Sequence, residues 1–215
     1  MIEGVVFDLD GLLLDSEQVW DATREQLVSE RGGRWHDRAQ RDMMGMSSLE
    51  WSRYMHDELG LSDPPEEISA EVVRRLEARY RTALPLLSGA REAVQRLAVR
   101  WPLALASSSN RELIDLALEL IGVGELFRAT VSSEEVARGK PAPDVYLEAA
   151  GRLGVEPTRA AAIEDSHNGI RAARAAGMRV IAIPNPHFPP GEEALAEADV
   201  VLRSLAELTP ETIEA

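Results

Sequence analysis

Short apolar runs alternate with amphipathic segments along most of the chain. The apolar runs are 4–8, 102–107, 128–132, 160–165 and 179–184, with a weaker one at 198–202. The amphipathic segments between them are 90–100, 111–122, 143–154 and 167–177, and the last three end at a glycine, a common helix C-terminal signal. Strands that alternate with helices are typical of a parallel, doubly wound sheet, so we predict an α/β fold.

One long stretch breaks this alternation. Between Asp15 and Leu87 about seventy residues pass without a strand signal, and helical patterns fill 16–31, 38–44, 47–59 and 66–84. Connections between a strand and a helix usually take only a few residues. We therefore predict an inserted helical cap domain at 16–87 and an α/β core domain formed by 1–15 and 88–215, with hinges at 14–16 and 85–89.

Composition narrows the class of protein. The net charge of −14 argues against nucleic acid as a partner, because binding to phosphates needs a basic surface. The chain has no cysteine, so it forms neither a disulfide nor a thiolate metal site. It has no run of about 18 apolar residues that could cross a membrane, and its apolar start is too short for a signal peptide. We expect a soluble cytoplasmic protein without a membrane or nucleic-acid partner, a monomer with a dimer as the alternative.

Reactive or ion-binding side chains stand at or shortly after the ends of the first four apolar runs. Ligands of open α/β sheets bind beyond the carboxyl ends of the strands, so these positions favour a shared site. Taken singly, a serine or an acid at such a position is an ordinary turn residue or helix cap, and only the joint pattern points to chemistry. The residues are Asp8 and Asp10 after the first run, Ser107 after the second, Lys140 after the third, and Glu164 and Asp165 after the fourth.

Lysine usage singles out Lys140. The chain has 23 lysine and arginine residues, yet Lys140 is its single lysine. Lysine carries a compact point charge that suits a tight phosphate or carboxylate site, whereas arginine is a wide planar fork. Chance is the alternative explanation, but the two prolines of "GKPAPD" also stiffen the loop that presents this side chain.

These motifs resemble those of the haloacid dehalogenase superfamily of phosphotransferases over the whole chain. "DLDG" resembles the first motif, "LASSSN" the second, "GKPAPD" the third and "IEDSHNGIRAA" the fourth, and the helical insertion stands between the first two. The resemblance implies a Rossmann-like core with a helical cap. The sequence is most similar to the branch of β-phosphoglucomutase and the sugar-phosphate phosphatases, of which 2-deoxyglucose-6-phosphatase is the better match.

The resemblance implies a role for each motif residue. Asp8 would be the nucleophile that forms an aspartyl phosphate, and Asp10 the general acid and then the base. Ser107 and Lys140 would bind the phosphoryl oxygens. Mg²⁺ would be the cofactor, because hard oxygen ligands suit it. Its ligands would be Asp8, the main-chain carbonyl of Asp10 and Asp165, with Glu164 nearby or bridging through water.

Electrostatics supports this set of roles. Two unit charges about 4 Å apart repel by roughly 4 kcal/mol at an effective dielectric of 20. Asp8, Asp165 and a phosphate dianion crowd more charge than one such pair. A divalent ion together with Lys140 would offset it, so the acids at the strand ends imply a metal, and the metal implies a phosphate.

The cap sequence bears on the substrate. We expect Gly11, Ser108, Asn110, Trp20, Met44 and Gly45 to bind it, with Trp20 as a flat apolar wall, although Trp20 could equally be a residue of the cap core. The loop 42–48 offers methionines and serines rather than the cations that a second phosphate would need. Arg24 and Arg53 could supply them if they turned inward, and we expect both to be solvated. The substrate is then a small phosphate monoester of a sugar or polyol, and the enzyme a phosphatase.

Three alternatives remain at this stage. A β-phosphoglucomutase-type phosphomutase would share the core motifs. A receiver-like signalling module also uses carboxylates, Mg²⁺, a hydroxyl and a lysine on a parallel sheet, but it needs no cap. A binding protein without activity is the third, and the complete motifs argue against it.

Overall fold

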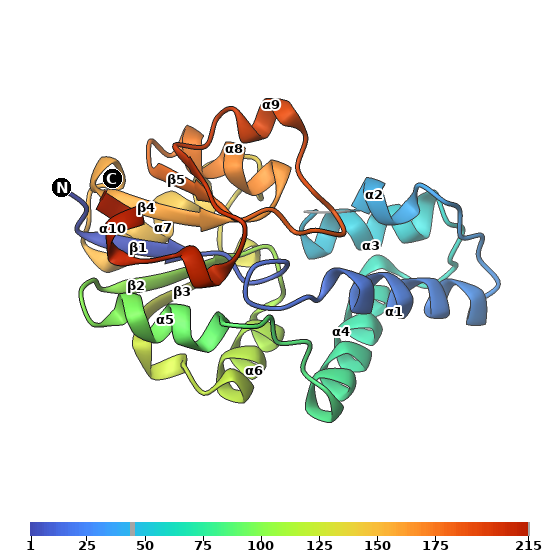
Figure 1. The fold of residues 1–215 in the computed structure, drawn as a ribbon. Helices are drawn as coiled ribbons and strands as arrows, with labels where there is room; N and C mark the ends of the chain where they lie inside the picture. Colours follow the sequence, from blue (N-terminus) through green and yellow to red (C-terminus); the bar gives the residue numbers. More distant parts are fainter. Residues whose placement is uncertain (44–45, 215) are drawn as a thin grey trace.

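The computed structural model describes residues 1–43 and 46–214, and a six-stranded sheet lies at its centre (Figure 1). All the strand pairs are parallel, in the order β3-β2-β1-β4-β5-β6. The strands are β1 (Gly4–Phe7), β2 (Leu103–Ser107), β3 (Phe127–Ser132), β4 (Ala160–Glu164), β5 (Arg179–Ala182) and β6 (Val200–Val201). The predicted α/β class with a parallel, doubly wound sheet is confirmed. No strand extends more than one residue beyond the apolar run that predicts it.

The order of the strands reverses at β1. Val5 of β1 lies opposite Leu103 of β2 on one side and opposite Ala161 of β4 on the other. From there β2 and β3 continue in one direction, and β4 to β6 continue in the other. Ligands of doubly wound folds bind at such a switch point, so the end of β1, where Asp8 stands, is the expected place for a site.

Helices cover both faces of the sheet. Successive strand residues point to opposite faces, and accordingly Val5 and Phe7 belong to one apolar cluster and Val6 to the other. The cluster of Val5 includes α5 (Ala90–Ala98) and α6 (Arg111–Ile121). The cluster of Val6 includes α7 (Asp144–Leu153) and α8 (His167–Ala175). Because both faces are packed, β1, β2 and β4 are buried along their whole length.

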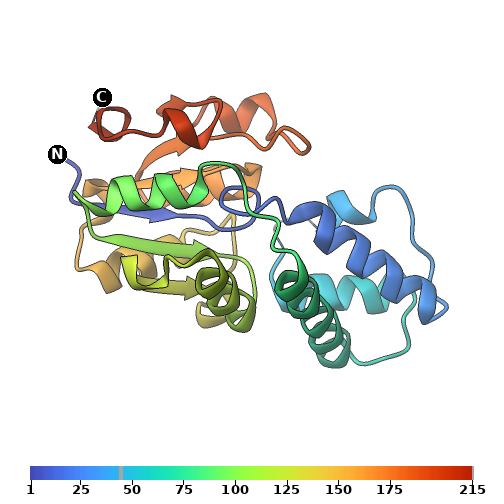
Figure 2. The same cartoon turned by 60° about the horizontal axis from the view of Figure 1, so that its bottom comes forward.

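The segment between β1 and α5, residues 16–87, is helical and is called the helical segment below. Its helices are α1 (Glu17–Glu30), α2 (Ala39–Met43), α3 (Ser48–Asp57) and α4 (Pro65–Thr82), one for each predicted pattern. In both views they lie together, to one side of the sheet (Figures 1 and 2). Their apolar faces pack on one another, and α4 also contacts α6.

The two connections to the helical segment run side by side. Leu14 and Leu86 form an antiparallel bridge. The Asp15 amide donates to the Pro85 carbonyl over 2.7 Å, and the Leu87 amide donates to the Leu13 carbonyl over 3.0 Å. The predicted hinge segments, 14–16 and 85–89, therefore lie next to each other.

Two short helices near the C-terminus, α9 (Glu192–Leu195) and α10 (Pro210–Glu214), were not predicted, because four or five residues are too few to show a helical period. Within residues 1–43 and 46–214, no helix has the length and apolar character needed to cross a membrane.

Candidate active site

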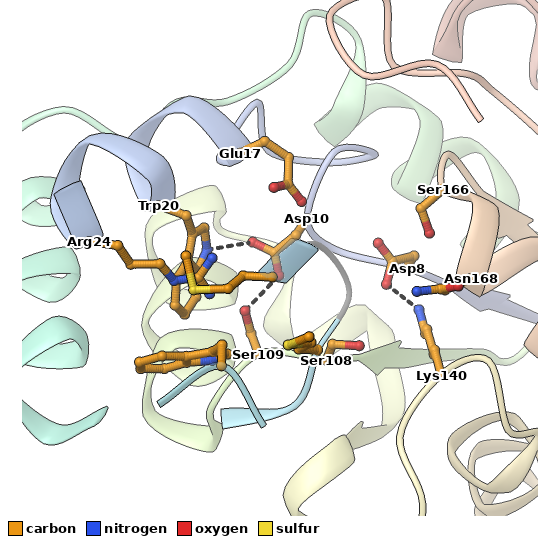
Figure 3. A pocket seen from close by; sticks show the side chains of 13 residues that line it. Asp8, Asp10, Glu17, Trp20, Arg24, Ser108, Ser109, Lys140, Ser166 and Asn168 are labelled. Atoms are coloured by element: carbon orange, nitrogen blue, oxygen red, sulfur yellow. Dashed lines mark hydrogen bonds and ion pairs between the residues drawn. The ribbon is translucent and has the colours of Figure 1, made fainter. Parts of the chain in front are cut away.

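A pocket lies between the carboxyl ends of the strands and the helical segment (Figure 3). Residues at the carboxyl ends of the strands line one side of it, and aromatic and cationic side chains of α1 and α3 line the other. The lining residues are Asp8, Asp10, Glu17, Trp20, Arg24, Met43, Met46, Trp51, Ser108, Ser109, Lys140, Ser166 and Asn168.

Lys140 connects two buried carboxylates. Its Nζ atom donates to Asp8 Oδ1 and to Glu164 Oε1, each over 2.6 Å, and to the Ala106 carbonyl over 3.1 Å. The three donors of the ammonium group are therefore all in use. Burial lowers the pKa of Lys140, but the charges of Asp8 and Glu164 outweigh burial and raise the pKa above its usual value. Lys140 is therefore a fixed positive charge beside Asp8.

Glu164 faces the protein rather than the pocket. Its Oε1 atom also accepts from the Tyr146 hydroxyl over 2.7 Å, and its Oε2 atom accepts from the amides of Asp165 and Ser166 and from the Ser166 hydroxyl. The side chain is fully buried, and a Cβ at position 169 would overlap it, so Gly169 makes room for it. Glu164 thus holds Lys140 in place.

Asp8 and Asp165 are the carboxylates that remain for a cation. Oxygens of Asp8, Glu164 and Asp165 lie within 4.8 Å of one another. Asp165 Oδ1 is buried and has no hydrogen-bond partner. Burial, followed by the negative charges of neighbouring carboxylates, raises the pKa of Asp165 well above its usual value. For Asp8 burial again raises the pKa most, and Lys140 opposes the shift only in part.

This set of donors fits a hard divalent cation such as Mg²⁺, which is bound through oxygen. The backbone at Gly11 adds to the fit. Gly11 has a φ of 85°, and a Cβ there would overlap the Asp165 carboxylate. Only glycine lets the loop after β1 approach Asp165 this closely.

The Asp10 carboxylate lies on the opposite side of the strand end from Lys140 (Figure 3). It accepts four hydrogen bonds, two from α1 and the residue before it and two from the last residue of β2 and the loop that follows. The donors are Ser16 Oγ at 2.6 Å and Trp20 Nε1 at 3.3 Å to Oδ1, and Ser109 Oγ at 2.6 Å and Ser107 Oγ at 3.2 Å to Oδ2. Asp10 therefore connects the helical segment to the sheet.

The predicted substrate-binding residues take different positions. Trp20 and Ser108 line the pocket, and the buried Ser108 hydroxyl has no partner. Ser107 is not a lining residue, since its hydroxyl lies between Asp10 and the Ser109 amide. Asn110 donates to Glu134 over 2.7 Å, outside the pocket. Met44 and Gly45 lie outside the described residues.

The expectation that Arg24 is solvated is wrong. Arg24 is 6% exposed and lines the pocket, with its guanidinium carbon 4.5 Å from the centroid of Trp20 and 4.8 Å from that of Trp51. Trp20 and Arg24 are one helical turn apart on α1 and so share a face, and Trp51 of α3 packs against that face. Burial lowers the pKa of Arg24 to about 10. Arg53 is exposed, as expected.

Several lining residues were missed from the sequence, Glu17 among them. Glu17, Trp20 and Arg24 recur at helical spacing, and this pattern could have placed all three on one face of α1. Burial and then the charge of Asp10 raise the pKa of Glu17 to about 7. Ser109 stands in the "SSS" run, where the sequence does not distinguish one hydroxyl from the next.

Comparison with known proteins identifies the family. The model of the haloacid dehalogenase-like hydrolases matches residues 2–177. The chain is 35% identical over 213 residues to the probable pseudouridine-5'-phosphatase of Drosophila melanogaster, covering 96% of this chain and 91% of that protein. It is 34% identical over 227 residues to hexitol phosphatase B of Escherichia coli K12, covering 97% and 95%. The crystal structure of CbbY from Rhodobacter sphaeroides in complex with phosphate has a TM-score of 0.88 and 28% identity, and it covers 100% of both chains.

The fold and the family match thus define a hydrolase. The chain belongs to the haloacid dehalogenase-like hydrolases, and it is an enzyme of the phosphatase class, as predicted. The family assignment removes the receiver-like alternative.

Proposed function

We propose that this enzyme is a Mg²⁺-dependent phosphatase that hydrolyses a small phosphate monoester of a sugar or polyol through an aspartyl phosphate on Asp8. The observation that carries the proposal is the position of Asp8. Its carboxylate is buried at the switch point of the sheet, 2.6 Å from Lys140 and grouped with Asp165. A nucleophile, a cation for the phosphate and a carboxylate for a metal therefore meet at one place.

The proposed reaction has two steps. In the first, an Asp8 oxygen attacks phosphorus and the bond from phosphorus to the ester oxygen breaks, while Asp10 donates its proton to the leaving alcohol. In the second, water attacks phosphorus, Asp10 takes a proton from that water, and the acyl phosphate bond breaks to release inorganic phosphate and the Asp8 carboxylate. Splitting the hydrolysis in this way lets one group serve as acid and then as base.

The neighbouring residues prepare this chemistry. Lys140 offsets negative charge on the phosphoryl group, and Glu164 positions Lys140 through the 2.6 Å contact. Asp8, Asp165 and the main-chain carbonyl of Asp10 would hold Mg²⁺, which neutralises charge on the phosphoryl oxygens when it is bound. The Asp10 side chain contacts α1 and the loop after β2, so it is oriented by both parts of the protein.

The substrate class rests on relatives and on the pocket. Two relatives of about one-third identity are named probable pseudouridine-5'-phosphatase and hexitol phosphatase B. Residues 16–87 would form the cap domain, over a core of 1–15 and 88–215. The paired connections at Leu14 and Leu86 would be its hinge, and α1 and α3 would face the leaving group.

A second candidate is a β-phosphoglucomutase-type phosphomutase. The observation that favours it is Arg24, a buried cation in the pocket of the kind that could grip a second phosphate. Supplying β-glucose 1-phosphate with a trace of glucose 1,6-bisphosphate separates the two candidates. Free phosphate forming faster than glucose 6-phosphate supports the phosphatase, and the reverse supports the mutase.

A phosphate-release screen tests the main proposal. The wild-type enzyme is given hexose, pentose and hexitol phosphates with Mg²⁺, and then with Mg²⁺ removed by a chelator. We expect release from at least one ester, lost on chelation and restored by added Mg²⁺. Full activity after chelation would refute the metal requirement, and no release from any ester would refute the substrate class.

A further inference from the structure

We propose that Arg24 forms a second anion-binding site in the pocket, so that the preferred substrate carries a carboxylate or a second phosphate on the part that leaves. The inference rests on the proposed function and narrows its substrate class. It replaces the expectation of a neutral polyol, which assumed that Arg24 faces solvent.

The two cations of the pocket lie at opposite ends of it. Figure 3 shows Lys140 beside Asp8 at one end of the pocket and Arg24 beside Trp20 at the other, with Asp10 between them. Lys140 already has carboxylate partners at 2.6 Å. Arg24 has none, since no ion pair among the described residues includes it.

The Arg24 side chain is more than nine-tenths buried, and part of its hydrogen-bonding capacity is unused. Its Nε atom is shielded from solvent and has no partner. A buried charge without a directly paired counter-charge is unfavourable, and aromatic contacts replace only part of the lost hydration. An anion delivered by a ligand would remove this penalty. An apolar residue at position 24 would not have this penalty at all, so the arginine is best explained by a ligand that needs it.

Nearby carboxylates do not provide that anion. Glu17, Asp10 and Asp21 lie close enough to raise the pKa of Arg24, but none forms an ion pair with it. Both Asp10 oxygens accept from other donors. Glu17 has a pKa of about 7, so near neutral pH it is only partly ionised.

The geometry of Arg24 suits a planar or tetrahedral oxyanion. Trp20 and Trp51 have ring centroids 4.5 Å and 4.8 Å from the guanidinium carbon, so cation–π contacts with both rings hold the guanidinium in the wall of the pocket. Guanidinium edges bind carboxylates and phosphates through paired hydrogen bonds. The shared chemistry is therefore an oxyanion at the far end of a phosphate ester.

Equilibrium binding tests the inference separately from turnover. Calorimetry is run with Mg²⁺ on the Asp8→Asn protein, which preserves the ligand, with three esters of similar size: hexitol 6-phosphate, 6-phosphogluconate and fructose 1,6-bisphosphate. The same titrations are made with Arg24→Gln and Arg24→Lys added. The matched control is Arg53→Gln, because Arg53 is an exposed arginine of α3 outside the pocket.

We expect 6-phosphogluconate, fructose 1,6-bisphosphate or both to bind about tenfold or more tighter than hexitol 6-phosphate, as paired hydrogen bonds to a charged group imply. Arg24→Gln should abolish that difference and change the binding of hexitol 6-phosphate, which has no second anion, by less than about threefold. Arg24→Lys should keep part of the difference, and Arg53→Gln should change nothing. If 6-phosphogluconate loses affinity in Arg24→Gln, the group that binds Arg24 is a carboxylate. If fructose 1,6-bisphosphate does, it is a phosphate.

Equal binding of all three esters, or an equal loss for all three in Arg24→Gln, would overturn the inference. If Arg24→Gln does not fold, the Arg24→Lys protein decides. A folded Arg24→Lys protein, which lacks the arginine fork, would also overturn the inference if it kept the full preference for the esters with a second anion. Failure of the proposed function has a different signature, namely that the wild-type enzyme releases no phosphate from any ester, including those that bind.

Discussion

The Nζ atom of Lys140 lies 2.6 Å from Asp8 Oδ1, although 132 positions separate the two residues in the sequence. The parallel sheet makes this contact, because β1 and β2 are adjacent and the loop that follows β3 crosses their carboxyl ends. The single lysine of the chain therefore stands beside the carboxylate that we assign as the nucleophile.

Lys140→Arg should damage activity although it preserves the charge. Lys140 is 7% exposed and its three donors meet three acceptors, so the wider guanidinium cannot fit without displacing Asp8 or Glu164. We expect kcat/KM for phosphate release to fall roughly 100-fold, the scale of losing one preorganised donor. The control is Arg138→Lys, on the exposed side of the same loop. Unchanged kcat/KM in Lys140→Arg would contradict a specific role.

Gly169→Ala should disturb the site through Glu164. A Cβ at this position overlaps the Glu164 carboxylate, whose two oxygens hold Lys140 and the start of α8. We expect lower thermal stability and a loss of kcat/KM. Gly151→Ala is the matched control, because Gly151 is also helical but has open space around it, and there the substitution should stabilise the protein by about 0.5–1 kcal/mol. Equal effects of the two substitutions on Tm would show that Gly169 has no special role.

Much of the fold was predictable because its signals are local. The six apolar runs became the six strands, and every predicted helix is present. Asp8, Asp10, Lys140 and Asp165 could be proposed as site residues because each follows a strand, and parallel strands bring their carboxyl ends together.

The contacts made by the helical segment were less predictable. Arg24 looked like a solvated residue on an amphipathic helix, and its burial depends on Trp51, which lies on a different helix. The side-chain contacts of Ser107 and Glu164 could not be predicted for a similar reason. The sequence places both at strand ends, but it does not show that Glu164 is enclosed by Tyr146 and Ser166, or that Ser109 shares Asp10 with Ser107. Such contacts depend on side chains from distant elements.

Glu134 links the helical segment to the core. Its Oε1 atom accepts from Ser48 Oγ and from Asn110 Nδ2, each over 2.7 Å, and its Oε2 atom accepts from the Arg111 amide over 3.1 Å. We expect Ser48→Ala to weaken this link by about 1.5–3 kcal/mol, as for a hydrogen bond to a charged group. Hydrogen exchange at the start of α3 should become faster, and KM should rise.

Ser52→Ala is the control for the Ser48 prediction. Ser52 lies on the same helix, but its hydroxyl donates only to the Leu49 carbonyl of α3. Exchange rates that change equally in the two variants would show that the Ser48 contact does not hold the helical segment against the core.

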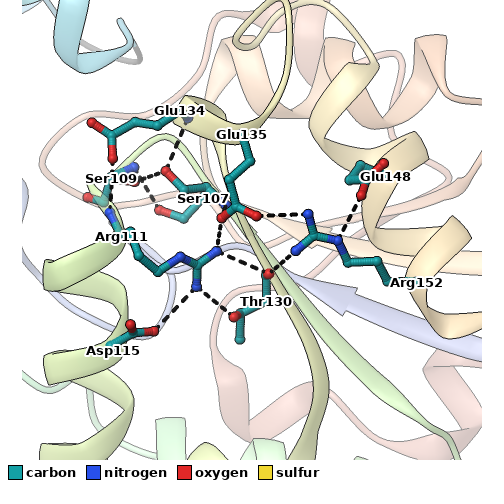
Figure 4. Close-up of polar contacts among 10 residues, drawn as sticks. Ser107, Ser109, Arg111, Asp115, Thr130, Glu134, Glu135, Glu148 and Arg152 are labelled. Carbon is teal, nitrogen blue, oxygen red and sulfur yellow. Dashed lines mark hydrogen bonds and ion pairs between the residues drawn. The ribbon is translucent and has the colours of Figure 1, made fainter.

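Glu135 should make stability depend on pH in the acidic range. Figure 4 shows its carboxylate between Arg111 and Arg152, and it also accepts from the Ser132 amide over 3.1 Å. Burial raises its pKa, but these partners outweigh burial and lower the pKa to about 2. Because the folded pKa lies below the unfolded one, the stabilisation is present above about pH 4.5 and is lost as the pH falls toward 2.

The corresponding measurement is the free energy of unfolding of Glu135→Gln against pH. Allowing for solvent screening, we expect a loss of about 1–2 kcal/mol at pH 7 that shrinks between pH 4.5 and 2. Glu148→Gln is the control, because Glu148 is more exposed and pairs with Arg152 alone, so its loss should stay within about 0.5 kcal/mol. A Glu135→Gln deficit that is constant from pH 7 to pH 2 would disprove the linkage.

The central claim, that Asp8 carries the phosphoryl group, is tested most directly by trapping it. Wild-type enzyme turning over a phosphate ester that it hydrolyses is quenched in acid within milliseconds, and the peptide that contains Asp8 is analysed by mass spectrometry. We expect this peptide to carry one phosphoryl group on Asp8 during turnover and none after the substrate is consumed, and Asp8→Asn to show neither the adduct nor phosphate release. An unmodified Asp8 peptide throughout turnover, together with phosphate release by Asp8→Asn at the wild-type rate, would contradict the account.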